Sequence, residues 1–215
     1  MIDHRAHADG NISSNRLDLK LIADMIPKGS RVLDIGCGTG ELLNILVRDR
    51  NVSGHGLELS QSGVNACVAR GLSVVQGDAD KDLSYYPSSG FDFVILSQTL
   101  QATQRPQDVL EEMARIGKKL IISIPNFGHW RVRLDLLLRG RMPETKTLNS
   151  QWYNTANIHL CTLLDFVDLA TLVGLKVDSH IMVHKNKIQQ SKSQISALDN
   201  LRAELGVFVL SPTMS

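Results

Sequence analysis

Apolar residues along the chain switch repeatedly between two kinds of spacing. Residues 17–26 carry leucine, isoleucine and methionine at helical intervals, which predicts a helix that ends at the Pro27–Gly29 segment. The apolar run at 31–35 is short and continuous, and it predicts a buried strand. The same alternation continues, with helices expected at 41–50, 60–71 and 106–115 and strands at 53–59, 72–76, 91–96 and 120–124. Strands that alternate with helices predict an α/β fold with a doubly wound, mostly parallel sheet.

The pattern changes after Pro125. Residues 126–160 show little clean periodicity, a helix is expected at 163–173, and strands are expected at 176–183 and 206–210. A polar stretch rich in Gln, Ser and Lys, 185–197, is expected to join the last two strands. We therefore predict a single domain over 1–215 in which 126–160 forms a cap or a docking segment.

Composition narrows the class of protein. The chain has 215 residues, 43% of them apolar, and a formal net charge of +1. That balance disfavours a dedicated nucleic-acid binder, which would carry a strong basic excess. No apolar run is long enough to span a bilayer, and the polar start resembles neither a signal peptide nor a membrane anchor. We therefore expect a cytoplasmic location.

The cysteines give no sign of a metal site or a disulfide framework. Cys37, Cys67 and Cys161 are odd in number, widely spaced and without a CxxC pair. We expect reduced thiols and no bound metal.

A glycine turn between the first strand and the next helix carries the strongest chemical signal. It reads Asp34-Ile-Gly-Cys-Gly-Thr-Gly40, in which the glycines allow positive φ and close approach of a ligand to the backbone. The carboxylate of Asp34 would repel a pyrophosphate by about 4 kcal/mol at a protein-surface dielectric. A ligand with an ammonium and a sulfonium group but no phosphate, such as S-adenosylmethionine, avoids this repulsion. A nicotinamide-dependent dehydrogenase is the disfavoured alternative, because the third glycine comes one residue early for its fingerprint.

Further polar residues follow the next strands. Glu58, at the end of the second strand, can accept hydrogen bonds from both ribose hydroxyls, and Asp78, after the third, can accept from the adenine amino group. The backbone N–H of Ala79 can reach an adenine ring nitrogen. The complete predicted set of cofactor-binding residues is Asp34, Gly36, Cys37, Gly38, Gly40, Glu58, Leu59, Asp78, Ala79 and Ser97.

Aromatic and basic residues gather in the 126–160 segment. The candidates for contact with a partner or substrate are Trp130, Arg131, Arg133, Trp152 and Tyr153. Arginine beside Trp and Tyr is typical of an interface or a substrate cap. The alternative is a plain helix whose leucines, Leu134, Leu137 and Leu138, pack inward while its arginines stay in water.

Catalytic candidates are few. His159 and His129 are the candidate general bases, because a histidine titrates near neutrality. Gln98 and Gln101, after the fourth strand, can orient a methyl acceptor but cannot take a proton. The Asn/Asp-Pro-Pro-aromatic motif common in enzymes that methylate amide or ring nitrogens is absent from this position of the sequence.

Residues 31–125, with the glycine turn and the three acids at strand ends, resemble the class I S-adenosylmethionine-dependent methyltransferases. The resemblance implies a seven-stranded Rossmann-like sheet with an antiparallel last strand, and a site for S-adenosylmethionine or S-adenosylhomocysteine.

Three further stretches of sequence indicate one family within this class. Residues 125–133 (PNFGHWRVR), 140–143 (GRMP) and 152–162 (WYNTANIHLCT) are similar to the MetW family of methionine biosynthesis proteins, although Thr39, Asn154 and Ala156 replace the acid, Asp and Pro usual there. That family implies a partner and activator of homoserine O-acyltransferase, with no established methyl transfer of its own. The alternative is an active methyltransferase on an unknown small molecule. Neither function implies contact with nucleic acid or membrane.

Overall fold

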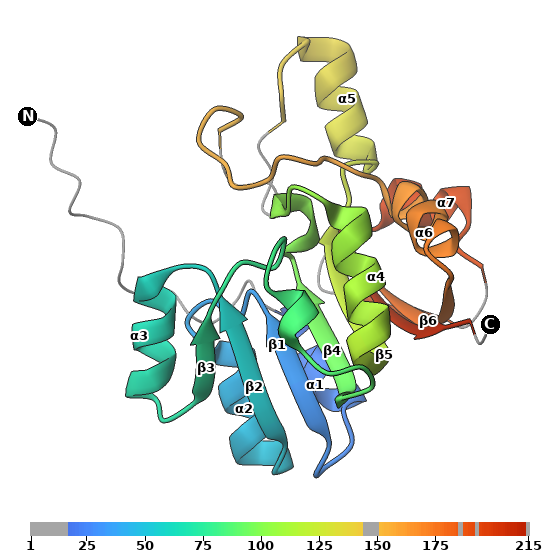
Figure 1. Ribbon diagram of the computed structural model, residues 1–215. Coiled ribbons are helices and arrows are strands. Elements are labelled where there is room, and N and C mark those ends of the chain that lie inside the picture. Colours follow the sequence, from blue (N-terminus) through green and yellow to red (C-terminus); the bar gives the residue numbers. More distant parts are fainter. Residues whose placement is uncertain (1–16, 144–150, 185–186, 192–193, 214–215) are drawn as a thin grey trace, which may run out of the picture.

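The computed structural model describes residues 17–143, 151–184, 187–191 and 194–213. One sheet organises these residues, with helices on both of its faces (Figure 1). Its strands are β1 (Arg31–Ile35), β2 (Ser53–Glu58), β3 (Ser73–Gln76), β4 (Phe91–Ser97), β5 (Gly117–Pro125), β6 (Leu175–His184), β7 (Lys187–Ser191) and β8 (Leu205–Pro212). The helices are α1 (Leu17–Met25), α2 (Glu41–Arg50), α3 (Gln61–Ala69), α4 (Pro106–Ile116), α5 (Trp130–Arg139), α6 (Leu163–Leu172) and α7 (Ala197–Arg202), with 3-10 turns η1 (Leu83–Tyr85) and η2 (Leu100–Ala102).

The strand order is β3-β2-β1-β4-β5-β8-β6-β7. Strands β1 to β5 are parallel, and β8, β6 and β7 each run antiparallel to the preceding neighbour in that order. The order changes direction between β1 and β4, and ligands of open α/β sheets bind at such a switch point. The predicted doubly wound, mostly parallel sheet with antiparallel C-terminal pairing is therefore confirmed.

The sheet has one strand more than the expected seven. The extra strand, β7, lies inside the stretch 185–197 that we expected to be a polar connection. Among the described strands it pairs with β6 alone, at the edge of the sheet. An edge strand with little to bury needs no regular apolar alternation, and for this reason the polar sequence of β7 did not predict it.

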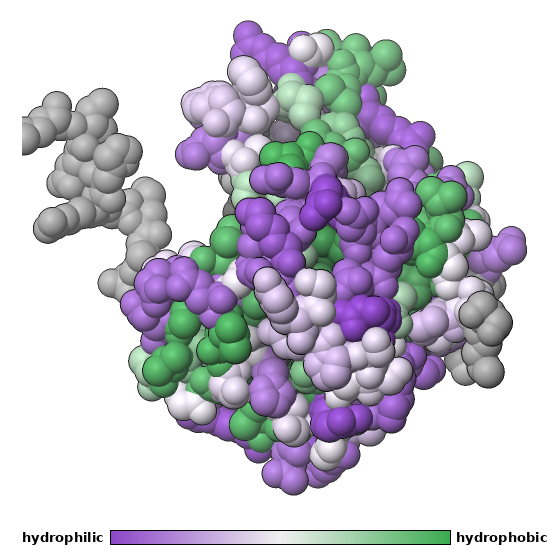
Figure 2. Space-filling view, in the orientation of Figure 1, coloured by the Kyte–Doolittle hydropathy of each residue, from purple (hydrophilic) through white to green (hydrophobic). Residues whose placement is uncertain are grey.

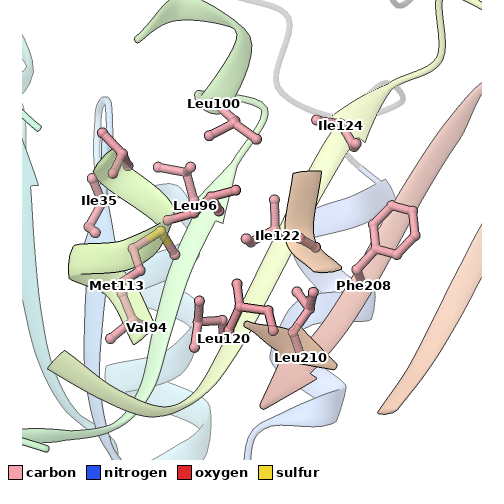
Figure 3. Packing of buried hydrophobic residues seen from close by; sticks show 14 of the residues in the cluster. Ile35, Val94, Leu96, Leu100, Met113, Leu120, Ile122, Ile124, Phe208 and Leu210 are labelled. Carbon is pink, nitrogen blue, oxygen red and sulfur yellow. The ribbon is translucent and has the colours of Figure 1, made fainter. Parts of the chain in front are cut away.

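Alternate residues of the central strands face opposite layers. Val94 and Leu96 pack toward α4 and α6, whereas Ile95 packs toward α1 and α2 on the other face. Figure 3 shows the first of these layers, where Met113 of α4 lies against β4 and Phe208 of β8 borders Ile122 and Ile124. Burial on both faces explains the continuous apolar runs of the sequence.

Capping side chains that are visible in the sequence explain where several helices begin. The Ser60 hydroxyl accepts a hydrogen bond from Gly63 N at 3.1 Å and caps α3, as its position predicts. Thr162 and Asp165 form a reciprocal capping box at the start of α6. Within the described part of the chain, each helix is too short or too polar to cross a bilayer.

Candidate functional site

A pocket opens where β1 and β4 end. Its lining combines the glycine turn with the start of α2, one residue of α1 and the last residue of β4: Leu19, Asp34, Gly36, Cys37, Gly38, Thr39, Glu41, Leu42 and Ser97. Five of the ten predicted cofactor-binding residues therefore come together here. The other five, namely Gly40, Glu58, Leu59, Asp78 and Ala79, do not line this pocket.

The backbone of the glycine turn is held against the neighbouring strand and loop. Gly36 N and Cys37 N both donate to Leu57 O of β2, at 2.7 and 3.2 Å. Gly36 has φ of +68°, and a Cβ there would lie 2.7 Å from Thr99 Cγ2. Any larger residue at this position would have to move Thr99 as well as accept a left-handed backbone.

Glu58 fastens the turn to the end of β2. Its two carboxylate oxygens accept from Gly38 N and Ser60 N, each at 2.8 Å. Each oxygen has a further lone pair, so the carboxylate can still accept hydroxyl donors from a ligand. Glu58 thus lies directly beside the glycine turn, and its predicted contact with a ribose stays a prediction.

Asp78 follows the end of β3, next in the sequence to Gly77. Gly77 N donates to Glu58 O at 3.0 Å, which brings the ends of β2 and β3 together. The hydrogen bond from Lys81 Nζ, 2.7 Å from Asp78 Oδ2, lowers the pKa of this carboxyl, and so does the backbone N–H of Asp80. Leu59 is exposed and Ala79 is half-buried.

One acid at this site was missed at the level of sequence. Asp18, in the first turn of α1, is only 1% exposed. It accepts from Ser97 Oγ at 3.1 Å and from Gln98 Nε2 at 2.8 Å, so it fixes the loop after β4 directly behind the pocket. An acid inside an otherwise apolar helical pattern was the available signal.

The charge of the pocket is one-sided. Asp34 and Glu41 contribute carboxylates to the lining, and no lysine or arginine is among the described residues that line it. A phosphate would meet repulsion without a compensating cation, whereas an ammonium or sulfonium would be attracted.

Burial and then the charge of Asp34 raise the pKa of the Cys37 thiol well above its usual value. At neutral pH Cys37 is therefore a protonated packing group and not a nucleophile.

A second, smaller pocket lies between the loop after β4 and the segment before α6. It is lined by Gln101, Pro125, Phe127, Asn157, His159, Leu160 and Cys161. Gln101 is 5% exposed, and its Nε2 donates to Gln98 O at 2.7 Å. Its buried Oε1 has no hydrogen-bond partner among the described residues, so it is an acceptor that a ligand could satisfy. His159 is exposed at this pocket, and its backbone N donates to Gln101 O at 2.9 Å.

The other catalytic candidate lies elsewhere. His129 is 4% exposed at the N-cap of α5 and lines neither pocket. Its ring lies close to the side chains of His184, at the end of β6, and Glu204, just before β8. The sequence spacing predicted no metal-binding group, because these three residues come from distant parts of the chain.

Helix α5 extends away from the sheet at the top of Figure 1, and Val132 is its one buried residue. Leu137 and Leu138 are 81% and 72% exposed, and Leu134 and Leu136 are also exposed. The alternative interpretation, a plain helix whose leucines pack inward, is wrong, because these leucines are exposed. Figure 2 shows the resulting green surface at the top of the molecule.

Three of the predicted contact residues, Trp130, Arg131 and Arg133, belong to α5 itself. Arg131 lies over the Trp130 ring, with its guanidinium carbon 5.3 Å from the ring centroid, and Arg133 Nε donates to Gly128 O at 2.6 Å. Trp152 and Tyr153 are exposed and meet edge to face. Part of the expected docking segment, 144–150, lies outside the described residues.

Comparison with known proteins identifies relatives of two kinds. The family described as "Methionine biosynthesis protein MetW" matches residues 16–210. A bifunctional methionine biosynthesis protein MetXA/MetW of Rhodopirellula baltica is 35% identical over 175 residues, which are 77% of this chain and 28% of that protein. The chain thus spans under a third of that relative's length.

Two further proteins that resemble the chain carry methyltransferase names. A fatty-acid O-methyltransferase of Mycolicibacterium smegmatis is 38% identical over 94 residues, which are 41% of this chain and 34% of that enzyme. The solved structure of an S-adenosylmethionine-dependent methyltransferase from Thermotoga maritima superposes with a TM-score of 0.65 at 18% identity, covering 92% of this chain and 87% of that one. This likeness establishes the class I methyltransferase fold.

Proposed function

This chain belongs to the MetW family of methionine biosynthesis proteins, and from that premise we propose that it binds S-adenosylmethionine and activates homoserine O-acyltransferase as a partner protein. The observation that carries the proposal is the exposure of four leucines on helix α5, namely Leu134, Leu136, Leu137 and Leu138. A surface of this kind is typical of a protein interface.

The name of the Rhodopirellula relative supports the same proposal. That protein combines MetXA and MetW in one polypeptide. Two activities joined in one chain are held at a high effective concentration, and separate chains achieve the same result by binding each other. A partner that covers α5 would bury the aromatic side chain of Trp130 together with the leucines, as interface anchors commonly are.

The acidic pocket supports the cofactor. An amino-acid ammonium and a sulfonium are cations, and Asp34 and Glu41 face the pocket with no arginine or lysine among its described lining. We propose that Glu58 and Asp78, whose strand ends are joined by the hydrogen bond from Gly77 N to Glu58 O, accept hydrogen bonds from the ribose and the adenine. Calorimetric titration tests this assignment. We expect binding of S-adenosylmethionine, a loss of at least about tenfold in affinity for Glu58→Gln, and no change for Glu111→Gln, an exposed acid of α4.

The activating role is tested by the acyltransferase rate. The host's homoserine O-acyltransferase is assayed at constant concentration with and without this protein, and we expect a higher rate and a co-purifying complex. Leu137→Asp and Arg131→Glu should abolish both effects. The matched control is Leu172→Asp, an equally exposed leucine on α6, which should abolish neither. An unchanged rate with no complex would contradict the proposal.

A second candidate function is methyl transfer to a small molecule. The buried, unsatisfied Oε1 of Gln101 favours it, because a hydroxyl or amino group of an acceptor could donate to this oxygen. His159 at the same pocket is then the candidate base. Transfer of label from S-adenosylmethionine into a metabolite extract tests this function. A labelled product that Gln101→Leu no longer forms would support it, and a protein that binds the cofactor but labels nothing would contradict it.

A further inference from the structure

We infer that His129, His184 and Glu204 form a binding site for a divalent transition-metal ion, with Zn²⁺ as the best-fitting ion. Each residue offers one ligand atom, and these atoms lie within 4.8 Å of one another. The residues come from three segments that meet at the end of the sheet: the loop between β5 and α5, the end of β6, and the residue before β8. This site lies apart from both pockets and goes beyond the proposed function.

The backbone around the three residues is tightly connected. Glu204 N donates to Val183 O at 2.8 Å, and Glu204 O accepts from Asn126 N at 3.0 Å. The Asn126 side chain donates to Asn200 O and Ala203 O at 2.7 and 2.8 Å. The three ligand-bearing segments are therefore fixed to one another before any ion binds, which reduces the ordering that binding would require.

The hydrogen bonding of His184 prepares it as a ligand. Its Nδ1 lies 2.6 Å from Arg202 O, and a carbonyl oxygen can only accept, so Nδ1 carries the proton. The lone pair of the neutral ring is then on Nε2. Metal-binding histidines commonly show this arrangement, in which a backbone carbonyl fixes the tautomer and the orientation of the ring.

His129 has a weaker competing contact. Its Nδ1 accepts from Arg131 N at 3.4 Å, which is long for a hydrogen bond and caps the first turn of α5. Coordination through either ring nitrogen would displace this contact, because Nδ1 would then either bind the ion or carry the proton. Occupation of the site and this capping contact are thus mutually exclusive, which connects the ion to the start of the apolar helix.

The donor set selects the class of ion. Two imidazoles and one carboxylate are the protein ligands of one type of zinc site that leaves a fourth position open. Imidazole also suits copper and nickel, whereas magnesium and calcium prefer oxygen ligands. Ligand atoms of tetrahedral zinc lie about 3.4 Å apart, so the three groups would have to approach one another by side-chain rotation. His184 and Glu204 are half-buried, which leaves the ion a path to the site.

The experiment uses the full chain after dialysis against a chelator. Zn²⁺ is titrated calorimetrically, and we expect one equivalent to bind. Glu204→Gln and His184→Gln should each lower the affinity by about 100-fold or more. His55→Ala, which removes an exposed histidine of β2 outside the group, should leave the affinity unchanged. Circular dichroism verifies that each variant is folded, and Glu204→Gln preserves the shape of the side chain.

A spectrum of the unaltered protein gives an independent measurement. Co²⁺ in the site should show visible d–d absorption without the near-ultraviolet charge-transfer band of a thiolate ligand, because no cysteine belongs to the group. Absence of stoichiometric Zn²⁺ binding overturns the inference. So does undiminished binding to Glu204→Gln, or a thiolate band with Co²⁺, since either result places the ion elsewhere.

Discussion

The pocket at the glycine turn and helix α5 place apolar side chains in opposite ways. Around the pocket the apolar side chains of Leu19 and Leu42 are buried, and the carboxylates of Asp34 and Glu41 belong to the lining. On α5 the leucines face outward and the buried contacts are few. The described residues of this chain supply the charged groups of the pocket, whereas α5 leaves apolar side chains exposed. The contrast separates a site for a small polar ligand from a surface for another macromolecule.

The largest expected difference in stability is between a leucine substitution in the buried sheet and one on α5. Leu96→Ala, at a fully buried position in β4, should lower the free energy of unfolding by about 2–5 kcal/mol, because it leaves a cavity. Leu137→Ala on α5 should change it by about 0.5 kcal/mol or less. Urea denaturation measures both. An equally large loss at Leu137 would show that α5 packs within the molecule and would remove the contrast.

A smaller loss of stability is expected when glycines of the turn are replaced by alanine, and two positions with positive φ can be compared. Gly36→Ala should cost about 2–3 kcal/mol of stability, because it adds a contact with Thr99 at 2.7 Å to the left-handed backbone. Gly38→Ala has open space around the new Cβ and should cost about 1 kcal/mol. Urea denaturation in the absence of ligand measures both variants.

A second substitution, which removes the contacting atoms of Thr99, tests the same explanation. Thr99→Ala removes the two atoms that would lie nearest to the Cβ introduced by Gly36→Ala. The double variant should therefore recover part of the stability that Gly36→Ala loses. Equal losses for Gly36→Ala and Gly38→Ala, with no recovery in the double variant, would show that close packing at the turn is unimportant.

The smallest effect concerns pH and the C-terminal strands. Burial lowers the pKa of His180 on β6, against an opposing influence of Asp199. As pH falls from 7.5 to 5.5, the unfolded chain, with a histidine pKa of about 6.5, takes up this proton first, so the free energy of unfolding decreases.

His180→Gln isolates that contribution. The variant should show a shallower decrease over the same pH range, because the remaining histidines titrate in both proteins. Urea denaturation at a series of pH values measures the difference. A steeper decrease in the variant would reverse the assigned direction of the pKa.

The fold was largely predictable where turns punctuate the sequence. Pro27, Gly71 and the 34–40 turn mark element ends, and the strands between them are buried on both faces. Strand β7 and helix α7 were not predicted. Strand β7 pairs only at the sheet edge, and α7 has six residues, too few to show a helical period. The glycine turn located the pocket because its residues are adjacent in the chain.

Long-range contacts account for what was missed at the sites. Asp18 reaches Ser97 only because α1 packs across the sheet, and the His129, His184 and Glu204 group forms only when β8 enters beside β6. Spacing along the chain contains no information about either. The exposure of Leu137 and Leu138 depends on the direction of α5, which helical periodicity alone does not define.

The placement of β8 also constrains the order of folding. Residues 205–212 pair between β5 and β6, although they are synthesised after both. At roughly 5–20 residues per second on the ribosome, the parallel strands β1–β5 can assemble first, while β6 waits for its neighbour. During that interval the exposed edge of β5 offers unpaired backbone groups to other nascent chains. Until residues 205–212 are synthesised, this edge of β5 stays open to pairing with other chains.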